Sequence, residues 1–178
     1  EVGSIQDPQI FKKVTSVRGT DLVFGGPPCQ GFSVAGKMNP ADERSQLVWN
    51  FLKVVENTKP QAFVMENVKA LAISSRWSDV RRRLFERAAE LKYQSTIIVL
   101  NSSRFGVPQN RERMFFVGIT NEIDITGRNN TLNEALYERL EDFTETPGDI
   151  RSVVLGFGRA GSRTNQRVCK AKVTFAKN

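Results

Sequence analysis

The chain has no histidine, and only two cysteines occur among its 178 residues. Without an imidazole, the Cys-His pair of papain-like hydrolases is excluded within this chain, so proton transfer must use a carboxylate, a lysine or water. A zinc site is also disfavoured, because Cys29 and Cys169 lie far apart and no four ligands have a recognisable spacing. Two cysteines without an evident pairing indicate a reducing compartment.

Long apolar runs are also missing. No stretch approaches membrane-spanning length, and the start of the chain has no secretory or transit signature. A hydrophobic share of 39% in 178 residues is enough for one globular domain with a core. We therefore expect a cytoplasmic protein with no membrane contact and no bound metal.

Acidic residues are absent from the last 28 positions. Residues 151–178 hold seven basic side chains, so the whole net charge of +7 lies there, while residues 1–150 hold 19 side chains of each sign. Thr146-Pro147-Gly148 marks a break between the two compositions. We predict one domain over residues 1–148 and the start of a basic region over 149–178, which suits contact with a nucleic-acid backbone.

The segment Gly156-Phe-Gly-Arg-Ala-Gly161 matches the dinucleotide-binding fingerprint directly after an apolar run. That fingerprint needs a following helix and an acidic residue about 20 positions later. The residues after Gly161 have no helical period, and no acidic residue follows. We therefore interpret this segment as a Gly- and Arg-rich strip that contacts nucleic acid.

Cys29 follows a short apolar strand, which is predicted over residues 22–24 and expected to be buried. Gly25 and Gly26 permit a sharp exit with close backbone approach, and two prolines then fix the turn. A lone cysteine is more often a buried core residue. Here the two prolines and the polar neighbours Gln30 and Ser33 favour a positioned nucleophile instead.

Apolar spacing predicts an alternating order of helices and strands. A short helix precedes residue 21, helices follow at 43–57 (with Asp42 as N-cap), 78–92 and 131–142, and strands are predicted at 62–65, 96–100 and 114–119. The strands at 22–24 and 62–65 are separated by a helix, so they should be parallel, with a right-handed crossover. Cys29 and Glu66 would then face one crevice at the carboxyl edge of the sheet.

The last two strands are joined by a short link without a helical period, which favours an antiparallel pair. The link would bring Gln109, Arg111 and Arg113 toward the same crevice, with the two arginines on one side of the strand. By contrast, the arginines of the helix at 78–92 are predicted to form a solvated face.

Three segments together resemble the cytosine-5 DNA methyltransferase family: Gly25-Gly-Pro-Pro-Cys-Gln-Gly-Phe-Ser33, Met65-Glu-Asn-Val68 and Gln109-Asn-Arg-Glu-Arg113. The resemblance covers roughly residues 21–120, and the chain departs from it at Pro27, where the family usually has Phe. It implies an α/β fold that is part of a Rossmann-like, S-adenosylmethionine-dependent sheet, mostly parallel with an antiparallel last strand. It also implies that the domain over 1–148 is without the family's N-terminal Gly-rich cofactor motif.

The resemblance implies transfer of a methyl group from S-adenosylmethionine to C5 of cytosine in DNA through a covalent bond between Cys29 and C6. It also assigns roles to the matching residues. The implied catalytic residues are Cys29, Glu66, Arg111 and Arg113; the cofactor contacts are Pro28, Leu47 and Asn67, with Asn67 also fixing the loop; and the DNA contacts are Gln30, Ser33 and Lys37.

The implied partners are double-stranded DNA with a flipped cytosine and, as a companion enzyme, a restriction endonuclease. The implied location is the cytoplasm of a bacterium, in association with the nucleoid. Two other hypotheses stay open: an RNA cytosine-5 methyltransferase with the same motifs, and a non-catalytic DNA-binding relative. The joint presence of Cys29, Glu66, Arg111 and Arg113 argues against the second of these.

Overall fold

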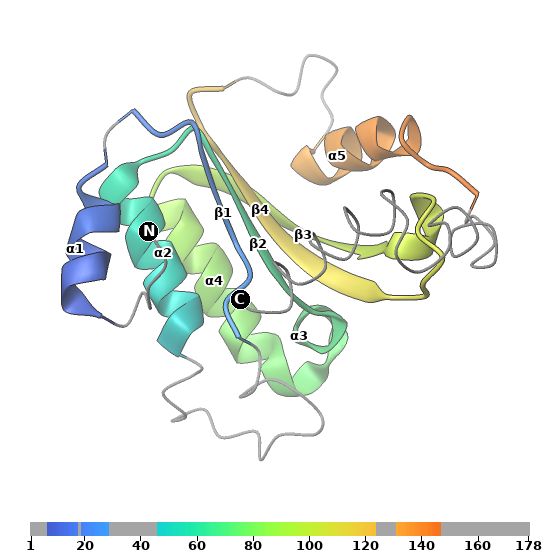
Figure 1. Cartoon of the computed structure of the whole chain (residues 1–178), viewed down its shortest axis with the longest axis horizontal. Helices are drawn as coiled ribbons and strands as arrows, with labels where there is room; N and C mark the ends of the chain where they lie inside the picture. The colour runs from blue at the N-terminus through green and yellow to red at the C-terminus, as the bar shows by residue number, and fades with distance from the viewer. Residues whose placement is uncertain (1–6, 18, 29–45, 124–130, 147–178) are drawn as a thin grey trace, which may run out of the picture. The chain divides into compact units, whose positions relative to one another are not determined.

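The computed structural model describes residues 7–17, 19–28, 46–123 and 131–146 (Figure 1). The chain divides into two compact units. The first comprises Glu1–Asn101 and Glu112–Phe143, and the second comprises Ser102–Arg111 and Thr144–Asn178. The predicted boundary between residues 148 and 149 falls outside the described residues and stays a prediction.

The first unit is built on a four-stranded sheet in the order β1-β2-β4-β3. The strands are β1 (Leu22–Gly25), β2 (Ala62–Val68), β3 (Tyr93–Asn101) and β4 (Glu112–Thr120). β1 pairs with β2 in parallel, and β4 lies antiparallel between β2 and β3. The predicted fold class, a mostly parallel α/β sheet with an antiparallel last strand, is confirmed.

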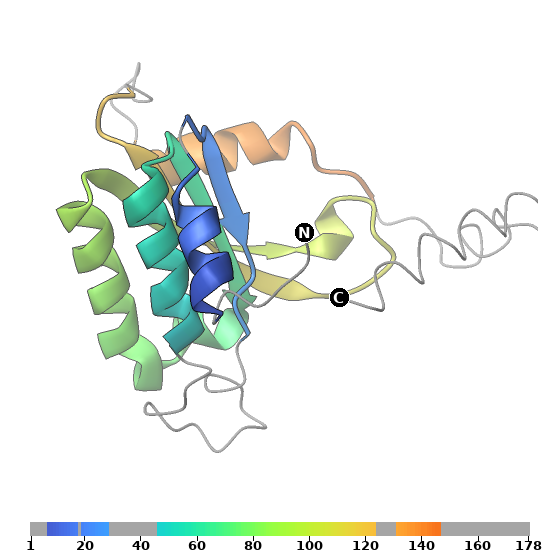
Figure 2. The same cartoon turned by 60° about the vertical axis from the view of Figure 1, so that its left-hand side comes forward.

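Helices cover both faces of this sheet. α1 (Pro8–Thr15), α2 (Gln46–Thr58) and α4 (Ser78–Glu90) lie side by side on one face, and α5 (Leu132–Glu141) lies over β3 on the other (Figures 1 and 2). The short helices α3 (Lys69–Ile73) and η2 (Ser75–Trp77) connect β2 to α4, and η3 (Ser102–Arg104) follows β3. Within the described residues, no helix is long and apolar enough to cross a membrane.

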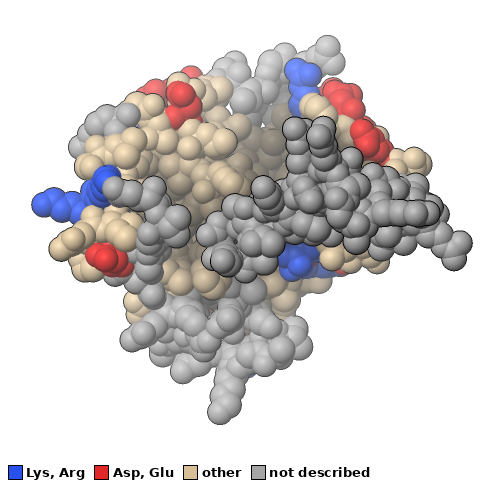
Figure 3. All heavy atoms as spheres, viewed as in Figure 1, with Lys and Arg blue, Asp and Glu red and all other residues tan. Residues whose placement is uncertain are grey.

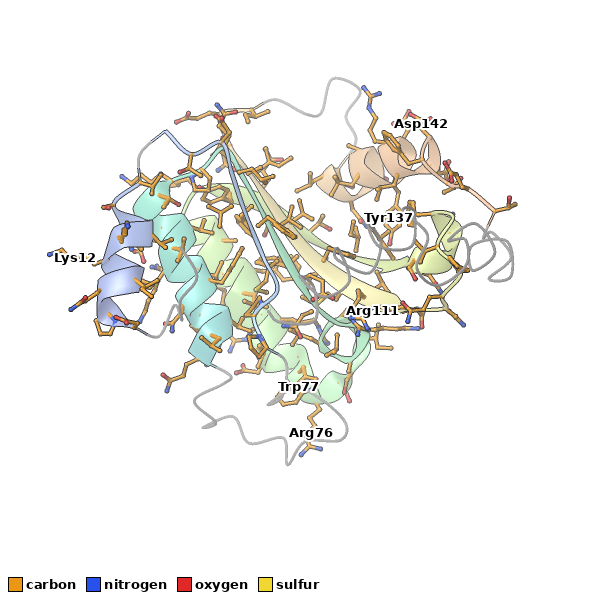
Figure 4. All side chains as sticks on the ribbon, in the orientation of Figure 1. Lys12, Arg76, Trp77, Arg111, Tyr137 and Asp142 are labelled. Carbon is orange, nitrogen blue, oxygen red and sulfur yellow. The ribbon has the colours of Figure 1, made fainter. Side chains whose placement is uncertain are left out.

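The core lies between the sheet and the α2 and α4 layer. Phe63 of β2 is fully buried and packs edge-on against Phe51 and Tyr93, with ring centroids 6.2 and 5.2 Å away. Trp77 closes the core at the start of α4, whereas its neighbour Arg76 points away from it (Figure 4). The apolar faces predicted for the helices at 43–57 and 78–92 therefore form the core.

The arginines of α4 have partners within the protein. Arg82 binds Asp79 and Glu86, and Arg87 binds Glu56 and Glu90. Arg83 stacks over the ring of Trp49, with Cζ 4.7 Å from the ring centroid. Carboxylate partners raise the pKa of the Arg82 and Arg87 guanidinium groups further. These contacts favour the solvated face predicted for this helix over a nucleic-acid surface, and they add ion pairs that the sequence did not predict.

Two sequence-based expectations about the strands were wrong. The strand at 22–24 was predicted to be buried, but Leu22 is 55% and Phe24 74% exposed, because exposure alternates along β1 and these two residues lie on its less covered face. The second strand was predicted to end at Met65, but β2 continues to Val68 because β4 pairs with it as far as Arg113. The predicted N-cap Asp42 lies outside the described residues.

Candidate active site

The site is built where β1 ends beside β2. Their parallel register places Gly25 opposite Met65, so Gly26 and Glu66 are the next residues along each path. The predicted common edge for the cysteine loop and the carboxylate is thus present as far as the structure describes the loop, that is, to Pro28.

Glu66 forms an ion pair across the sheet with Arg113. Arg113 Nε lies 3.0 Å from Glu66 Oε1, and both side chains are partly buried. A second guanidinium nitrogen of Arg113, Nη1, donates to the backbone carbonyl of Glu112 at 2.8 Å. Two donors of one planar group are therefore engaged, so the guanidinium is held in a defined orientation beside the carboxylate.

Asn67 connects the end of β2 to the start of the cysteine loop. Its side chain is only 2% exposed, and its Nδ2 donates to the carbonyl of Pro27 at 3.2 Å. Its Oδ1 accepts from the backbone N–H of Val68 at 2.9 Å. A buried amide that is satisfied on both sides fixes local geometry. Asn67 thus holds Pro27, two residues before Cys29, against the strand that carries Glu66.

The double glycine leaves room for two neighbouring side chains to approach closely. A Cβ on Gly26 would lie 3.2 Å from Glu66 Oε2, and a Cβ on Gly25 would lie 3.2 Å from Cε2 of Phe51. Neither glycine has a positive φ, unlike Gly19 and Gly106. The absence of a side chain, rather than backbone freedom, is therefore what these two positions supply.

An apolar hollow of about 640 Å³ opens beside β1, within the range of small-molecule sites. Two residues predicted to contact a cofactor, Pro28 and Leu47, line it. Much of the remaining lining is apolar and comes from α1, α2 and β1, for example Val14, Phe24, Phe51 and Val54. On the face drawn in Figure 3, the described surface beside α1 and β1 is largely uncharged. No carboxylate belongs to the described lining.

The structure does not bring every predicted residue to this place. Cys29, Gln30, Ser33 and Lys37 lie outside the described residues. Arg111 (labelled in Figure 4) belongs to the second compact unit, where its carbonyl accepts from the backbone N–H of Ser102. The roles assigned to these residues, and to Glu66, Arg113, Asn67, Pro28 and Leu47, stay predictions.

Sequence reasoning missed one contact close to the site. Lys69 Nζ lies 2.8 Å from both carboxylate oxygens of Glu112, the residue before Arg113. Lysine and glutamate are common on surfaces, so neither residue carries a signal by itself. The contact depends on the β2–β4 register, which the sequence does not display.

The family comparison covers nearly the whole chain. The model of the C-5 cytosine-specific DNA methylase family matches residues 2–174. Among curated proteins, the chain is 46% identical over 106 residues to the type II methyltransferase M.AquIA of Picosynechococcus sp.. It is 28% identical over 189 aligned residues to M.NaeI of Lentzea aerocolonigenes. The matches cover 55% and 98% of this chain, but only 43% and 45% of the relatives.

A solved structure agrees with this assignment. It is the structure of a DNA modification methyltransferase encoded within a prophage of E. coli, which superimposes on this chain with a TM-score of 0.55 and 28% sequence identity. The match covers 69% of this chain and 34% of the solved chain. The chain thus spans less than half the length of the relatives that it matches. It belongs to the C-5 cytosine-specific DNA methylase family.

Proposed function

We propose that the protein of which this chain is part transfers a methyl group from S-adenosylmethionine to C5 of cytosine in DNA. The observation that carries the proposal is the Glu66–Arg113 ion pair, which lies against Gly26 at the base of the cysteine loop. A carboxylate and a guanidinium at one end of the sheet can recognise the edge of an extruded base by hydrogen bonds.

The chemistry requires activation of the ring, because C5 of cytosine is a poor nucleophile. The Cys29 thiolate attacks C6 and forms the S–C6 bond, and the π electrons of the C5–C6 double bond then make C5 nucleophilic. After the methyl group has passed to C5, water takes up the C5 proton, the C5–C6 double bond forms again, and the S–C6 bond breaks to release the Cys29 thiolate. A cysteine is suited to this cycle, since a few per cent of a free thiol is thiolate at neutral pH.

Glu66 and Arg113 would stabilise the charge that accumulates on the ring. Glu66 shares a proton with N3, while Arg113 orients Glu66 through the 3.0 Å contact and binds the cytosine O2. Arg111 would act beside them. Preorganised donors of this kind are usually among the largest contributions to catalysis, with about 3 kcal/mol lost when one is removed.

S-adenosylmethionine, when bound, would supply the electrophilic methyl group. The apolar hollow fits its ring-bearing part, since Pro28, Leu47 and the aromatic ring of Phe51 offer apolar surface there. The described lining has no carboxylate to bind the ribose hydroxyls, so this lining accounts for one side of the site. Asn67 would hold Pro27, and with it the cysteine loop, beside the hollow.

The proposal also names a substrate, a companion enzyme and a cellular location for the complete protein. Duplex DNA with a flipped cytosine is the substrate, and Gln30, Ser33 and Lys37 would hold the loop on its backbone. The type II methyltransferase relatives come from bacteria such as Haemophilus parahaemolyticus. We therefore place the protein at the nucleoid in bacterial cytoplasm, with a restriction endonuclease as its companion.

The test is covalent trapping with the complete protein. DNA that carries 5-fluorocytosine should form a stable adduct, because fluorine at C5 blocks the final elimination. Cys29→Ala should abolish the adduct, whereas Cys169→Ala should leave it intact. An adduct with Cys29→Ala would show that the nucleophile is misassigned, and methylation of transfer RNA in place of duplex DNA would favour the RNA alternative.

A further inference from the structure

The structure assigns a role to Lys69, and we propose that Lys69 and Glu112 form a clamp that positions Arg113 for Glu66. The inference rests on the proposed function, because it concerns the same carboxylate and guanidinium. Lys69 touches neither Glu66 nor Arg113 in the contacts described, so it would be a positioning residue rather than a catalytic one.

The β2–β4 register places Lys69 and Glu112 directly beyond the last paired residues of the two strands. Val68, the last residue of β2, is the cross-strand partner of Arg113. The next positions along the same ladder are Lys69 and Glu112, but there the chain leaves β2 and enters α3. The contact between Lys69 Nζ and both Glu112 oxygens, at 2.8 Å each, therefore joins the start of α3 to β4 one position after the pairing of β2 with β4 ends.

The contacts continue from this pair to the carboxylate. Glu112 uses its side chain for Lys69 and its backbone carbonyl for Arg113 Nη1, at 2.8 Å. Arg113 Nε then lies 3.0 Å from Glu66 Oε1. If the first residue of β4 shifts, its carbonyl turns, and the guanidinium loses the contact that orients it toward Glu66.

Helix stability does not account for the lysine. Lys69 is the first residue of α3, a position where a cation opposes the helix dipole, and the first turn has no acidic residue to offset it. Isolated ion pairs between exposed side chains also contribute little to stability. The position of Lys69 is better explained by what its partner does for Arg113.

On one side, Glu112 is already held by β3, as the cross-strand partner of Asn101. On the other side, pairing with β2 ends at Arg113. The clamp would therefore hold Glu112 on the β2 side, which strand pairing leaves open.

The test uses the complete protein and compares Lys69→Gln with Arg82→Gln, which removes an exposed ion-paired cation from α4. Lys69→Gln should lower kcat for methyl transfer about tenfold, with the KM for DNA and the melting temperature unchanged, since small displacements of positioned groups reduce rates. Arg82→Gln should leave kcat unchanged. The charge exchange Lys69→Glu with Glu112→Lys should restore most of the lost rate.

Three results would overturn the clamp: a kcat for Lys69→Gln within about twofold of wild type, a raised KM for DNA with kcat unchanged, or no recovery on charge exchange. The first would show that the pair has no role in the reaction, and the second would show that Lys69 binds DNA. If wild-type protein itself transfers no methyl group to cytosine, the proposed function fails, and this is seen before any variant is compared.

A measurement without turnover tests the geometric part. Arg113 Nε lies 3.0 Å from Glu66 Oε1 in the ion pair, so exchange of its Nε–H proton with water, followed by nuclear magnetic resonance, should be slow. Exchange should become severalfold faster in Lys69→Gln and stay unchanged in Arg82→Gln. Unchanged exchange in Lys69→Gln would overturn the clamp whatever the state of the methylation activity.

Discussion

Glu66 and Arg113 come from antiparallel neighbouring strands, and their side chains meet with Nε and Oε1 3.0 Å apart. Their backbone positions are two rungs apart along the ladder, since Glu66 pairs with Phe115 and Arg113 with Val68. The long arginine side chain covers that offset. The ion pair therefore depends on the β2–β4 register, and a register slip would separate the two groups.

Replacing Glu66 by Gln should slow methyl transfer about a hundredfold or more, because the amide keeps the shape but cannot share a proton with N3. DNA binding should stay nearly intact. The rate is measured by incorporation of labelled methyl groups under single-turnover conditions. Glu86→Gln, which removes the carboxylate bound to Arg82 on α4, is the matched control. A rate for Glu66→Gln within about threefold of wild type would remove Glu66 from the mechanism.

Alanine at the two adjacent glycines should have different kinetic effects. Gly26→Ala places a methyl group 3.2 Å from Glu66 Oε2 and should lower kcat about tenfold, because the carboxylate must move. Gly25→Ala places one 3.2 Å from the Phe51 ring, which lines the hollow, and should instead raise the KM for S-adenosylmethionine. Steady-state kinetics on both variants checks this. The assignment of the hollow fails if Gly25→Ala leaves that KM unchanged.

Asn67→Ala should destabilise the first unit by about 1–3 kcal/mol, because the change leaves the Pro27 carbonyl and the Val68 N–H without their partner in a buried place. Urea unfolding followed by circular dichroism measures the loss. Asn57→Ala is the control, since Asn57 Nδ2 donates to the carbonyl of Lys53 at an exposed position of its own helix. Equal losses for the two variants would contradict a special role for Asn67.

The pH dependence of stability should contain a contribution from Tyr93. Its hydroxyl is buried and donates to the Pro60 carbonyl at 2.6 Å, and burial raises the pKa of Tyr93 above its usual value. Because the folded-state pKa exceeds the unfolded value of about 10, this contribution is fully present below about pH 10 and is lost as pH rises through the folded-state pKa.

Tyr93→Phe should therefore cost about 1 kcal/mol at neutral pH, since the Pro60 carbonyl loses its donor. Above about pH 10 the difference between wild type and variant should shrink, because only the wild type has this tyrosine to ionise. Urea unfolding across the alkaline range measures both. A constant difference up to about pH 12 would show that Tyr93 does not titrate with unfolding.

Periodicity predicted the helices well because their apolar faces are the core. Phe51 and Leu84, for example, are buried as their spacing indicates. The same approach failed at Glu66 and Asn67, where two polar residues suggested the end of a strand. Pairing with β4 extends the strand through both, so tertiary contacts override local polarity.

The candidate site was predictable only in part. Local motifs predicted that Glu66 and Arg113 would lie at one edge of the sheet, because each motif is tied to a strand end. The hydrogen bond between Asn67 and Pro27 joins residues 40 positions apart in the sequence, and the ion pair between Lys69 and Glu112 joins residues 43 positions apart. Such contacts follow from register and backbone path, and residue types alone do not determine either.

The 178-residue chain by itself should bind S-adenosylmethionine weakly, with a Kd above about 100 μM. The described lining of the hollow is largely apolar and has no carboxylate, and Leu22 and Phe24 on the adjoining strand are exposed rather than packed. A ligand held on one side loses much of the burial that gives affinity. Calorimetric titration measures the Kd, and Leu47→Ala shows whether any binding uses the hollow. Micromolar affinity that survives Leu47→Ala would move the cofactor site elsewhere in this sequence, and Gly156–Gly161 would then be the segment to test.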